Sequence, residues 1–494
     1  MTALALIVVL LPLVPAFSTV FTAEARPLGL TAAASGLATL AVAVALTIDV
    51  GGGRRLHGLS GFLYLDSLSG FFLATIALVV ALASVGSAAY VRAEEQRGEL
   101  RPLQVRLYFI FFAIFASMML ASFETGSLGL LWVLIEASTL ASCVLVGLEG
   151  KPVSLEAAWK YIIISSFGVT IALVGTLFLY FAASNLPGSP TEHLTWSYLF
   201  AHSGGLSAES LRLAFLLALI GYGTKVGLAP MHTWLPDAHS EAPSPASAML
   251  SAALLNTGMY AIIRFQALTH AELGTHYASR ILLIFGFASV IIGALFIILR
   301  GNYKRLFAYS SVEHMGIISI ALGFGGVLGL YGALLHTLTH AIGKAVLFLT
   351  SGDLVLRYRT RLVNEVRGVL SVSPLTGAVL LLTALAVAGS PPFGLFLSEF
   401  TIVRAGLARS SIVLVAALLV LLAIVFIALV GAVAEMALGG APDRPTAGPA
   451  YRDRSERLLA GAPLVAGLVL LLLLGVWIPG GLDRLIMHSI QAIS

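Results

Sequence analysis

Long apolar stretches alternate with short polar loops along the whole chain. A helix that crosses a lipid bilayer needs about 20 mostly apolar residues, and fourteen stretches meet that requirement. The pattern therefore predicts an all-α polytopic membrane protein with about fourteen transmembrane helices. The predicted segments are 2–22, 29–48, 62–90, 105–122, 127–147, 157–183, 211–232, 243–268, 279–299, 304–322, 326–356, 372–404, 411–438 and 459–482.

Three of these segments contain residues that interrupt a helix. The seventh holds Pro230 and the twelfth holds Pro391 and Pro392, and a proline removes a backbone donor from the helical ladder. The eleventh has Gly343 beside polar residues. Broken helices persist in a bilayer only where protein or water satisfies the freed backbone groups. The sequence therefore predicts polar sites inside the membrane at these positions.

The composition excludes a soluble enzyme. Hydrophobic residues make up 59% of the chain and charged residues only 11%, whereas soluble domains carry about 25% charged residues. Cys143 is the only cysteine, so the chain by itself cannot form a disulfide, an iron–sulfur cluster or a cysteine-ligated zinc site. We expect no redox centre, cofactor or metal in this chain, and no nucleic-acid partner.

Lysine and arginine are distributed unequally between the two sets of loops. The loops after odd-numbered segments hold 17 of the 28, and those after even-numbered segments hold 7. Cytoplasmic loops are enriched in Lys and Arg, so we expect a multi-pass protein of the inner (plasma) membrane with both termini outside. The loops 91–106, 357–367 and 441–458 would then be cytoplasmic. The apolar start of the chain, without preceding Lys or Arg, favours a first transmembrane helix over a cleaved signal.

Ionisable residues recur inside the predicted helices. A charge at membrane depth is costly and usually marks a functional site. His336, His340 and Lys344 follow one another at intervals of four, which places them on one helical face. The complete set of buried ionisable candidates is Glu136, Lys225, His314 with its neighbour Glu313, His336, His340, Lys344 and Glu399.

These side chains have the chemistry of a proton pathway. A desolvated lysine near a carboxylate changes its protonation state with its surroundings, and histidine exchanges protons near neutral pH. A buried Glu or Lys can instead form a structural ion pair, and a buried His can be an ordinary core residue. Haem ligation by His336 and His340 is a further alternative, which Lys344 on the same face disfavours.

Three stretches carry a family resemblance. They are GTKVGLAPMHTWLPDAHSEAPSPASAMLS at 223–251, NYKRLFAYSSVEHMG at 302–316 and LLHTLTHAIGKAVLFL at 334–349. In these stretches the chain resembles the antiporter-like subunits of respiratory complex I, of Mrp-type sodium/proton antiporters and of membrane-bound hydrogenases. The strings SVEHMGI, WKYIIISSFG at 159–168 and GSPPFGLFLSEF at 389–400 make it most similar to the hydrogenase-4 component F type.

The resemblance implies a particular helical arrangement. Helices 4–8 and 9–13 would form two inverted five-helix repeats, with helices 7 and 12 broken. The chain would then divide into an N-terminal three-helix segment (1–104), a first repeat (105–268), a second repeat (279–438) and a C-terminal helix 14 (459–494). The chain ends soon after helix 14, so we expect it to lack the long lateral helix of the most distal complex I subunit.

Roles for individual residues also follow from the resemblance. The matches are Glu136 for the glutamate of helix 5, Lys225 for the lysine of helix 7, His314 for a histidine of helix 10, His340 and Lys344 for a pair at a break in helix 11, and Glu399 for the charged residue of helix 12. From these matches we predict a buried ion pair between Glu136 and Lys225.

Asn256 departs from the family pattern, because many relatives have a lysine at this position of helix 8. Asparagine does not exchange a proton near neutral pH, but its amide can orient water. We predict a hydrated stretch between Lys225 and His340 that Asn256 lines, with protons moving on to Lys344 and Glu399. The alternative is that Asn256 only contributes to a helix contact and the route bypasses it.

The resemblance implies a proton-translocating subunit of a redox-driven respiratory complex of the hydrogenase-4 or complex I type. Its expected partners are other membrane subunits, including further antiporter-like ones, lipid, and a hydrogenase-like soluble redox arm reached through a proximal membrane subunit. Three alternatives remain: a cation/proton antiporter subunit of an Mrp-like assembly, the proton-path subunit of a non-redox complex, and a structural subunit with an idle channel.

Overall fold

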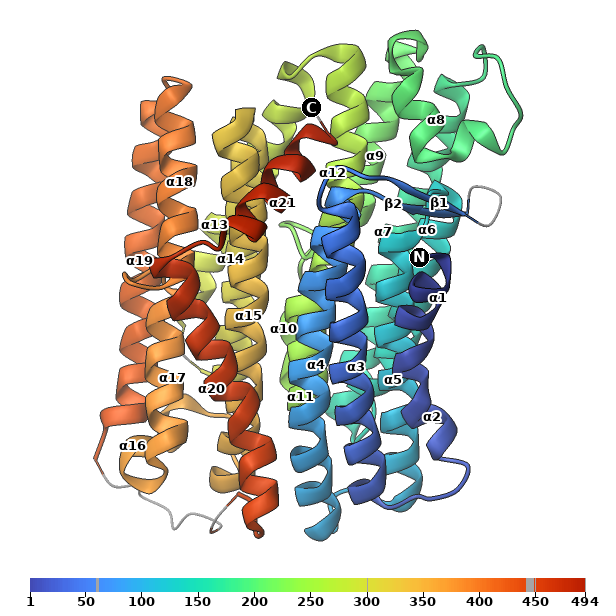
Figure 1. Ribbon diagram of the computed structural model, residues 1–494. Helices are drawn as coiled ribbons and strands as arrows, with labels where there is room; N and C mark the ends of the chain where they lie inside the picture. The colour runs from blue at the N-terminus through green and yellow to red at the C-terminus, as the bar shows by residue number, and fades with distance from the viewer. Residues whose placement is uncertain (59–61, 300, 441–447, 449, 494) are drawn as a thin grey trace.

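The computed structural model describes residues 1–58, 62–299, 301–440, 448 and 450–493, and most of them are helical (Figure 1). The elements up to the middle of the chain are α1 (Thr2–Leu10), η1 (Leu11–Leu13), α2 (Val14–Ser18), α3 (Ala25–Val50), β1 (Leu56–Gly58), β2 (Leu63–Leu65), α4 (Ser67–Gln96), α5 (Pro102–Glu124), α6 (Leu128–Val146), α7 (Pro152–Ala182), η3 (Glu192–Leu194), α8 (Trp196–Ala201), η4 (Ser203–Gly205), α9 (Ala208–Val226), α10 (Trp234–Glu241), α11 (Ser244–Met249), η5 (Leu250–Leu254) and α12 (Leu255–Leu273).

The second half of the chain continues the same pattern of long helices and short connections. Its elements are α13 (His276–Ile297), α14 (Tyr303–Phe324), α15 (Gly326–Tyr358), η6 (Val363–Glu365), α16 (Val369–Val372), α17 (Pro374–Val387), α18 (Gly394–Ala408), α19 (Ile412–Leu438), α20 (Arg454–Val476) and α21 (Gly480–Gln491).

The helices have the length and composition of membrane spans. In the described part of the chain, eleven helices are long and apolar enough to cross a bilayer, and two shorter apolar helices cover Thr2–Ser18 and Pro374–Val387. Each of the fourteen predicted segments overlaps between one and three helices. The predicted all-α polytopic membrane fold is therefore confirmed, whereas the number of fourteen crossings and the internal repeats remain predictions.

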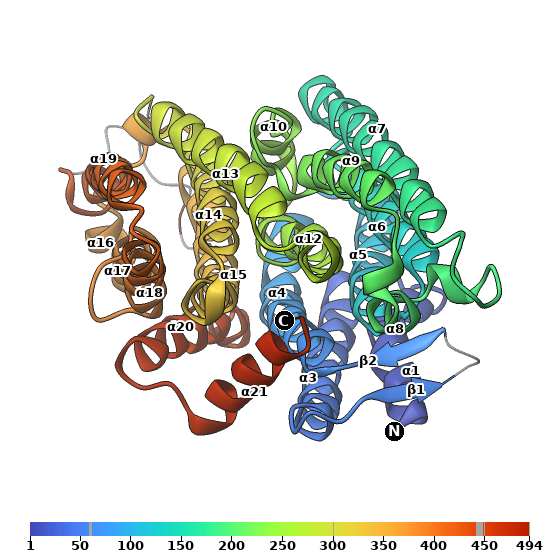
Figure 2. The same ribbon diagram turned by 90° about the horizontal axis from the view of Figure 1, so that it is seen from above.

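The helices before and after residue 275 lie side by side. Seen from above (Figure 2), α4, α10 and α12 lie near the middle, α7 and α9 lie on one side, and α17, α18 and α19 lie on the other. The two sets of helices meet where α10 packs on α14 and where α11 and η5 pack on α15. Hydrogen-bond-length contacts between Ser251 and Ser311 (2.7 Å) and between Ser244 and Ser351 (3.3 Å) make this seam polar.

Proline interrupts two helices at the predicted positions. Pro230 lies between the end of α9 and the start of α10, and Pro391 and Pro392 lie between α17 and α18. At the first break the backbone N–H of Ala229 donates to Ser289 Oγ at 2.9 Å. A side chain of a neighbouring helix thus satisfies one backbone group near the break, as an apolar environment requires.

The predicted break in helix 11 is wrong. The helix α15 runs without interruption from Gly326 to Tyr358, through Gly343. A Cβ atom at Gly343 would lie 2.9 Å from Val387 Cγ2 of α17, which is closer than packed carbon atoms approach. The glycine therefore permits close packing of α15 against α17 and does not interrupt the helix.

A buried ion pair joins the N-terminal helices to α12. Asp66, which caps α4 by accepting from Ser69 N at 2.9 Å, accepts two hydrogen bonds of 2.7 Å from the Arg264 guanidinium. The guanidinium also lies 4.7 Å from the ring centre of Trp196 and 5.0 Å from that of Tyr260. Burial alone would raise the pKa of Asp66, but the paired guanidinium holds that pKa below its ordinary value.

The predicted pattern did not include a β-hairpin or the amphipathic helix after α20. Strands β1 and β2 form a short antiparallel hairpin, and Leu63 of β2 also bridges to Thr125 at the end of α5. The amphipathic helix α21 follows α20 and crosses α4 and α15, against which it buries Leu485, Ile486 and Ile490 (Figure 1).

Ion pairs join several loops at one end of the molecule, the lower end in Figure 1. They connect Arg92 with Asp453 (3.0 Å), Arg359 with Glu99 (2.7 Å), Arg361 with Glu241 (2.7 Å) and Arg367 with Glu435 (2.9 Å). Parts of all three loops predicted to be cytoplasmic therefore meet at the same end. Residues 441–447 and 449 of the third loop lie outside the described residues, and the side of the membrane that this end faces remains a prediction.

Candidate functional site

Lys225 lies in the last turn of α9, just before the break at Pro230, and is fully buried. Its ammonium donates to Thr139 Oγ1 at 2.6 Å and to the Tyr161 hydroxyl at 2.9 Å. The Tyr161 hydroxyl also lies 2.7 Å from Ser142 Oγ. Helices α6 and α7 therefore present hydroxyl groups to the ammonium of α9.

Glu136 does not pair directly with Lys225. Its Oε1 atom accepts from Ser166 Oγ of α7 at 2.5 Å, and its Oε2 atom has no hydrogen-bond partner among the described residues. The predicted ion pair is therefore wrong. Residues three apart lie about one turn apart along a helix, so Glu136 and Thr139 occupy successive turns of α6, and it is Thr139 that faces the ammonium.

Asn256 lies at the start of α12, directly after the π-helical turn η5. Its Nδ2 donates to the Ala252 carbonyl of that turn at 2.7 Å. The residue is fully buried, yet its Oδ1 has no hydrogen-bond partner among the residues that the structure describes. Single π-turns within helices occur frequently at functional sites, and this one leaves Asn256 with one free acceptor.

His239 of α10 and Lys304 of α14 are buried polar residues that the sequence-based set omitted. The Lys304 ammonium donates to the Ala242 carbonyl at 2.6 Å. The His239 ring stacks on Phe348 of α15 with centroids 4.8 Å apart, and in the described part of the chain neither ring nitrogen has a partner. Sequence reasoning missed them because α10 is too short to stand out as a span, and because Lys304 is the first residue of its predicted segment, at the boundary with a loop.

The predicted polar face of α15 is present. The Lys344 ammonium donates to the Phe307 carbonyl of α14 at 3.0 Å. His336 and His340 both lie next to His314, with ring centroids 5.1 and 5.2 Å from it. Both ring nitrogens of His340 are unpartnered among the described residues, although the side chain is fully buried.

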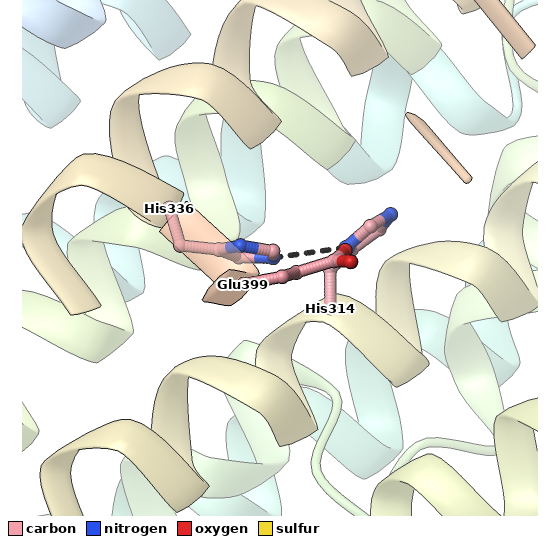
Figure 3. A group of neighbouring side chains, drawn as sticks. All are labelled: His314, His336 and Glu399. Atoms are coloured by element: carbon pink, nitrogen blue, oxygen red, sulfur yellow. Dashed lines mark hydrogen bonds between the residues drawn. The ribbon is translucent and has the colours of Figure 1, made fainter. Parts of the chain in front are cut away.

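A hydrogen-bond chain links the histidines to α18, and Figure 3 shows its contact between His314 and His336. His314 Nδ1 lies 3.0 Å from His336 Nε2, and His336 Nδ1 lies 2.8 Å from Ser398 Oγ. Ser398 Oγ donates its own proton to the Leu395 carbonyl at 2.7 Å. The serine oxygen therefore accepts from His336, which assigns the proton of neutral His336 to Nδ1 and the lone pair to Nε2.

Glu399 completes this cluster. One ligand-type atom each of His314, His336 and Glu399 lies within 4.8 Å of the others (Figure 3). Gly389, whose φ is 75°, packs directly against the Glu399 carboxylate. A Cβ atom at this position would lie 2.2 Å from Glu399 Oε2. The break between α17 and α18 thus provides the space that the carboxylate occupies. Glu399 also borders an apolar groove of about 430 Å³ between α18 and α19.

A charged cavity of about 560 Å³ opens at the end where the loop ion pairs lie. Four carboxylates and three cations line it: Glu94, Glu99, Glu149, Glu241, Lys151, Arg359 and Arg361. Glu241 directly precedes Ala242, whose carbonyl binds the Lys304 ammonium. The cavity therefore approaches the buried seam that contains Lys304 and His239.

The predicted residues thus fall into two groups. The first group lies where α6, α7 and α9 meet: Lys225 binds Thr139 of α6, and Glu136 lies one turn away from Thr139 on the same helix. The second group gathers where α14, α15 and α18 meet, and it contains His314, His336, His340 and Glu399, with Lys344 on the same face of α15. Asn256, His239 and Lys304 belong to the elements between the two groups.

Comparison with known proteins supports the relationship suggested by the motifs. The family described as "NADH:quinone oxidoreductase/Mrp antiporter, TM" matches residues 125–425. A hydrogenase-4 component F homolog of Methylacidiphilum infernorum (isolate V4) is 39% identical over 349 residues, which are 71% of this chain and 73% of that protein. Hydrogenase-4 component B of Escherichia coli (strain K12) is 30% identical over 453 residues, which are 87% of this chain and 64% of that protein.

Solved structures share the fold at lower identity. A chain of the membrane-bound sulfane sulfur reductase, an archaeal respiratory membrane complex, matches with a TM-score of 0.86, 22% identity and coverage of 99% of this chain and 97% of that one. A chain of the Mrp complex from Dietzia sp. DQ12-45-1b matches with a TM-score of 0.84, 22% identity and coverage of 99% and 96%. The family match and the 39% identical relative establish that this chain belongs to the NADH:quinone oxidoreductase/Mrp antiporter transmembrane family.

Proposed function

We propose that this chain is a proton-translocating membrane subunit of a redox-driven respiratory complex of the hydrogenase-4 or complex I type. One observation carries the proposal: buried ionisable side chains follow one another across both broken helices. They are Lys225, His239, Lys304, His314, His336, His340, Lys344 and Glu399. Buried charges are costly inside a membrane protein, and where they recur they mark ion pathways.

Unpartnered polar atoms suggest where water joins this route. In the described part of the chain, the unpartnered atoms near this route include those of Asn256, His239, His340, Ser310 and Glu313. Buried polar groups are nearly always hydrogen-bonded to protein or water, and a buried water uses two to four polar partners. The proposed route follows these atoms, with protons passing between side chains through water.

The charged cavity is the proposed entrance. Protons would pass from Glu241 through Lys225 and Lys304, cross to His239, and continue to Lys344 and the α15 histidines. Glu399 would release them on the opposite side. The Lys and Arg excess of the loops at the cavity end favours a cytoplasmic entrance. In this proposal His239 supplies, from α10, the exchangeable proton that Asn256 of helix 8 does not carry.

The proposed partners follow from the relatives. Hydrogenase-4 components and subunits of respiratory complexes are the proteins to which this chain is similar. We infer that other membrane subunits pack beside it and that a hydrogenase-like soluble arm supplies the redox energy through a proximal membrane subunit. This chain has one cysteine, so the iron–sulfur chemistry belongs to those partners.

Proton uptake into liposomes tests the proposal. The complex captured through a tag on this chain is reconstituted with the internal pH dye pyranine, and a potassium gradient with valinomycin supplies the driving potential. Lys225→Ala should abolish uptake, because it removes a protonatable group from the first half of the route. The matched control Lys160→Ala, at a partly exposed lysine that pairs with Glu156, should retain uptake. Parental uptake in Lys225→Ala at normal protein levels would refute the proposal.

The same liposomes distinguish the redox-driven complex from the antiporter alternative. The antiporter alternative is considered because the chain shares its fold with a chain of an Mrp complex. An outward or inward sodium gradient replaces the potassium gradient and valinomycin. Proton movement that depends on sodium and disappears in Lys225→Ala would favour the antiporter. Proton uptake that does not depend on the sodium gradient, together with co-purification of a redox arm, supports the redox-driven complex.

A further inference from the structure

We propose that His314, His336 and Glu399 form an inhibitory binding site for a divalent transition-metal ion of the zinc class. The three side chains come from α14, α15 and α18, and each is buried. Their ligand-type atoms lie within 4.8 Å of one another (Figure 3). The bound ion would occupy the place where the proposed proton route passes from the histidines to Glu399.

The ligand set selects the class of ion. Two imidazole nitrogens and one carboxylate oxygen form an open zinc site in known enzymes, whereas calcium and magnesium take oxygen ligands. Zinc bonds of about 2.0–2.2 Å in a tetrahedral site separate ligand atoms by about 3.4 Å. The facing nitrogens of His314 and His336 are 3.0 Å apart, so a shift of a few tenths of an ångström accommodates an ion between them.

The surroundings of the two imidazoles orient them as in metal sites. Metal-bound histidines usually donate their other ring N–H to an oxygen. Ser398 Oγ takes this position beside Nδ1 of His336, and Glu313 Oε2 lies 3.6 Å from Nε2 of His314. The nitrogens that remain, Nε2 of His336 and Nδ1 of His314, are the two that face each other.

The unpartnered side chain of His340 is a second observation that supports a bound ion at this site. It is fully buried, its ring lies 5.2 Å from that of His314, and neither ring nitrogen has a partner among the described residues. A small side-chain rotation would bring one nitrogen to the ion as a fourth ligand. Two carboxylates, Glu399 and Glu313, balance the ion's charge against the nearby Lys344 ammonium.

Glu399 is the member of the site that borders a groove. The carboxylate borders the groove of about 430 Å³ between α18 and α19. On binding, the ion displaces the proton that His314 and His336 share, and it engages Glu399. The route past these three side chains would then be closed. This inhibitory effect rests on the proposed function, whereas metal binding does not.

Cobalt binding to the purified full-length protein tests the site, because tetrahedral Co²⁺ absorbs visible light and zinc displaces it. The wild-type protein should show this absorption and lose it on addition of Zn²⁺. Glu399→Gln and His336→Gln should each weaken Co²⁺ binding roughly 100-fold. Loss of a residue that only hydrogen-bonds a metal ligand already weakens metal binding by up to about this factor. His57→Gln, at an exposed histidine of the β1 strand, is the matched control. Equal Co²⁺ binding in all four proteins would overturn the site.

X-ray absorption of the zinc-loaded wild-type protein tests the site without any substitution. The expected spectrum shows imidazole scattering from at least two histidines, and a shell of oxygen ligands alone would overturn the site. Inhibition is tested separately in the pyranine liposomes, where Zn²⁺ should stop proton uptake by the wild-type protein. Metal binding without any effect on uptake would overturn the inhibitory role and leave the site and the proposed function standing.

Discussion

Single polar atoms set the chemistry along the α12, α14 and α15 helices. Among the described residues, Oδ1 of Asn256 and both ring nitrogens of His340 have no hydrogen-bond partner. Each has a fixed position, because Asn256 donates to the Ala252 carbonyl and His340 packs beside His314. Substitutions at this scale should therefore change proton flow more than they change the fold.

Asn256→Leu removes the amide while roughly keeping its volume. If Asn256 orients water between Lys225 and His340, this variant should lose most proton uptake in the pyranine liposomes. The matched control Asn185→Leu lies in an exposed loop and should behave as the parent. Asn256→Lys should conduct, because lysine restores the group that relatives carry there. Full uptake by an assembled Asn256→Leu would show that the route bypasses this residue and depends on His239 instead.

Gly389 leaves space for the Glu399 carboxylate. An added Cβ atom would lie 2.2 Å from Glu399 Oε2, and the positive φ of 75° disfavours a side chain there as well. We expect Gly389→Ala to move the carboxylate and to reduce proton uptake sharply. The combined variant Gly389→Ala with Glu399→Asp should recover part of the uptake, because the shorter side chain needs less room. The control Gly481→Ala adds a Cβ atom with nothing within 4 Å.

At the level of elements, the apolar periodicity and the prolines predicted the helices and both breaks. Proline interrupts a helix for a local chemical reason, so Pro230 and Pro391 were informative by themselves. Gly343 led to a wrong prediction, because a glycine within a helix can mark either a break or a close contact with another helix. The two cases differ only in the position of the neighbouring helix, which the sequence does not give. The π-helical turn η5, the β1–β2 hairpin and α21 have no equally strong local signal.

The sequence predicted which residues belong to the candidate site, but it did not predict which of them contact one another. Spacing alone placed His336 and His340 on one face of α15. The partner of Lys225 depends on how α6 is placed along its axis relative to α9, and that placement brings Thr139, one turn from Glu136, to the ammonium. His239 escaped prediction because it lies in a helix of eight residues directly after a break.

The ion pair of Asp66 with Arg264 should hold the N-terminal helices against α12. Asp66→Asn leaves a buried guanidinium without its counter-ion, which typically costs about 3–5 kcal/mol. The purified variant should therefore unfold at a lower temperature than the parent, as followed by circular dichroism. The matched control Asp49→Asn removes only the exposed pair with Arg54. An unchanged unfolding temperature would show that this pair contributes nothing to stability.

The difference in stability between the parent and Asp66→Asn should depend on pH in one direction. The pKa of Asp66 is lowered in the folded protein by Arg264, so its stabilising contribution is complete above the ordinary carboxyl pKa of about 3.9. The contribution is lost as the pH falls through the lowered value. The stability gap between parent and Asp66→Asn should therefore be constant near neutral pH and shrink only in acid.

At the scale of the whole molecule, the ion-paired loops gather at one end and should face the cytoplasm. In a Cys143→Ser background, Gly98→Cys lies at that end and Gly52→Cys lies in the loop after α3. An impermeant thiol reagent added to intact cells should label Gly52→Cys, whereas Gly98→Cys should react only after the membrane is opened. Labelling of Gly98→Cys in intact cells would reverse the proposed orientation.

The central claim is that one route runs through both broken helices, with Lys225 and Glu399 acting in series. The most direct measurement is proton uptake in the pyranine liposomes by Lys225→Ala, Glu399→Gln and the double variant, with Lys160→Ala as the control. For groups in series each single variant should abolish uptake, and the double variant should be no worse, because residues that act as a unit are strongly non-additive. Two single variants that each keep about half of the parental uptake, with losses that add in the double variant, would contradict the single route.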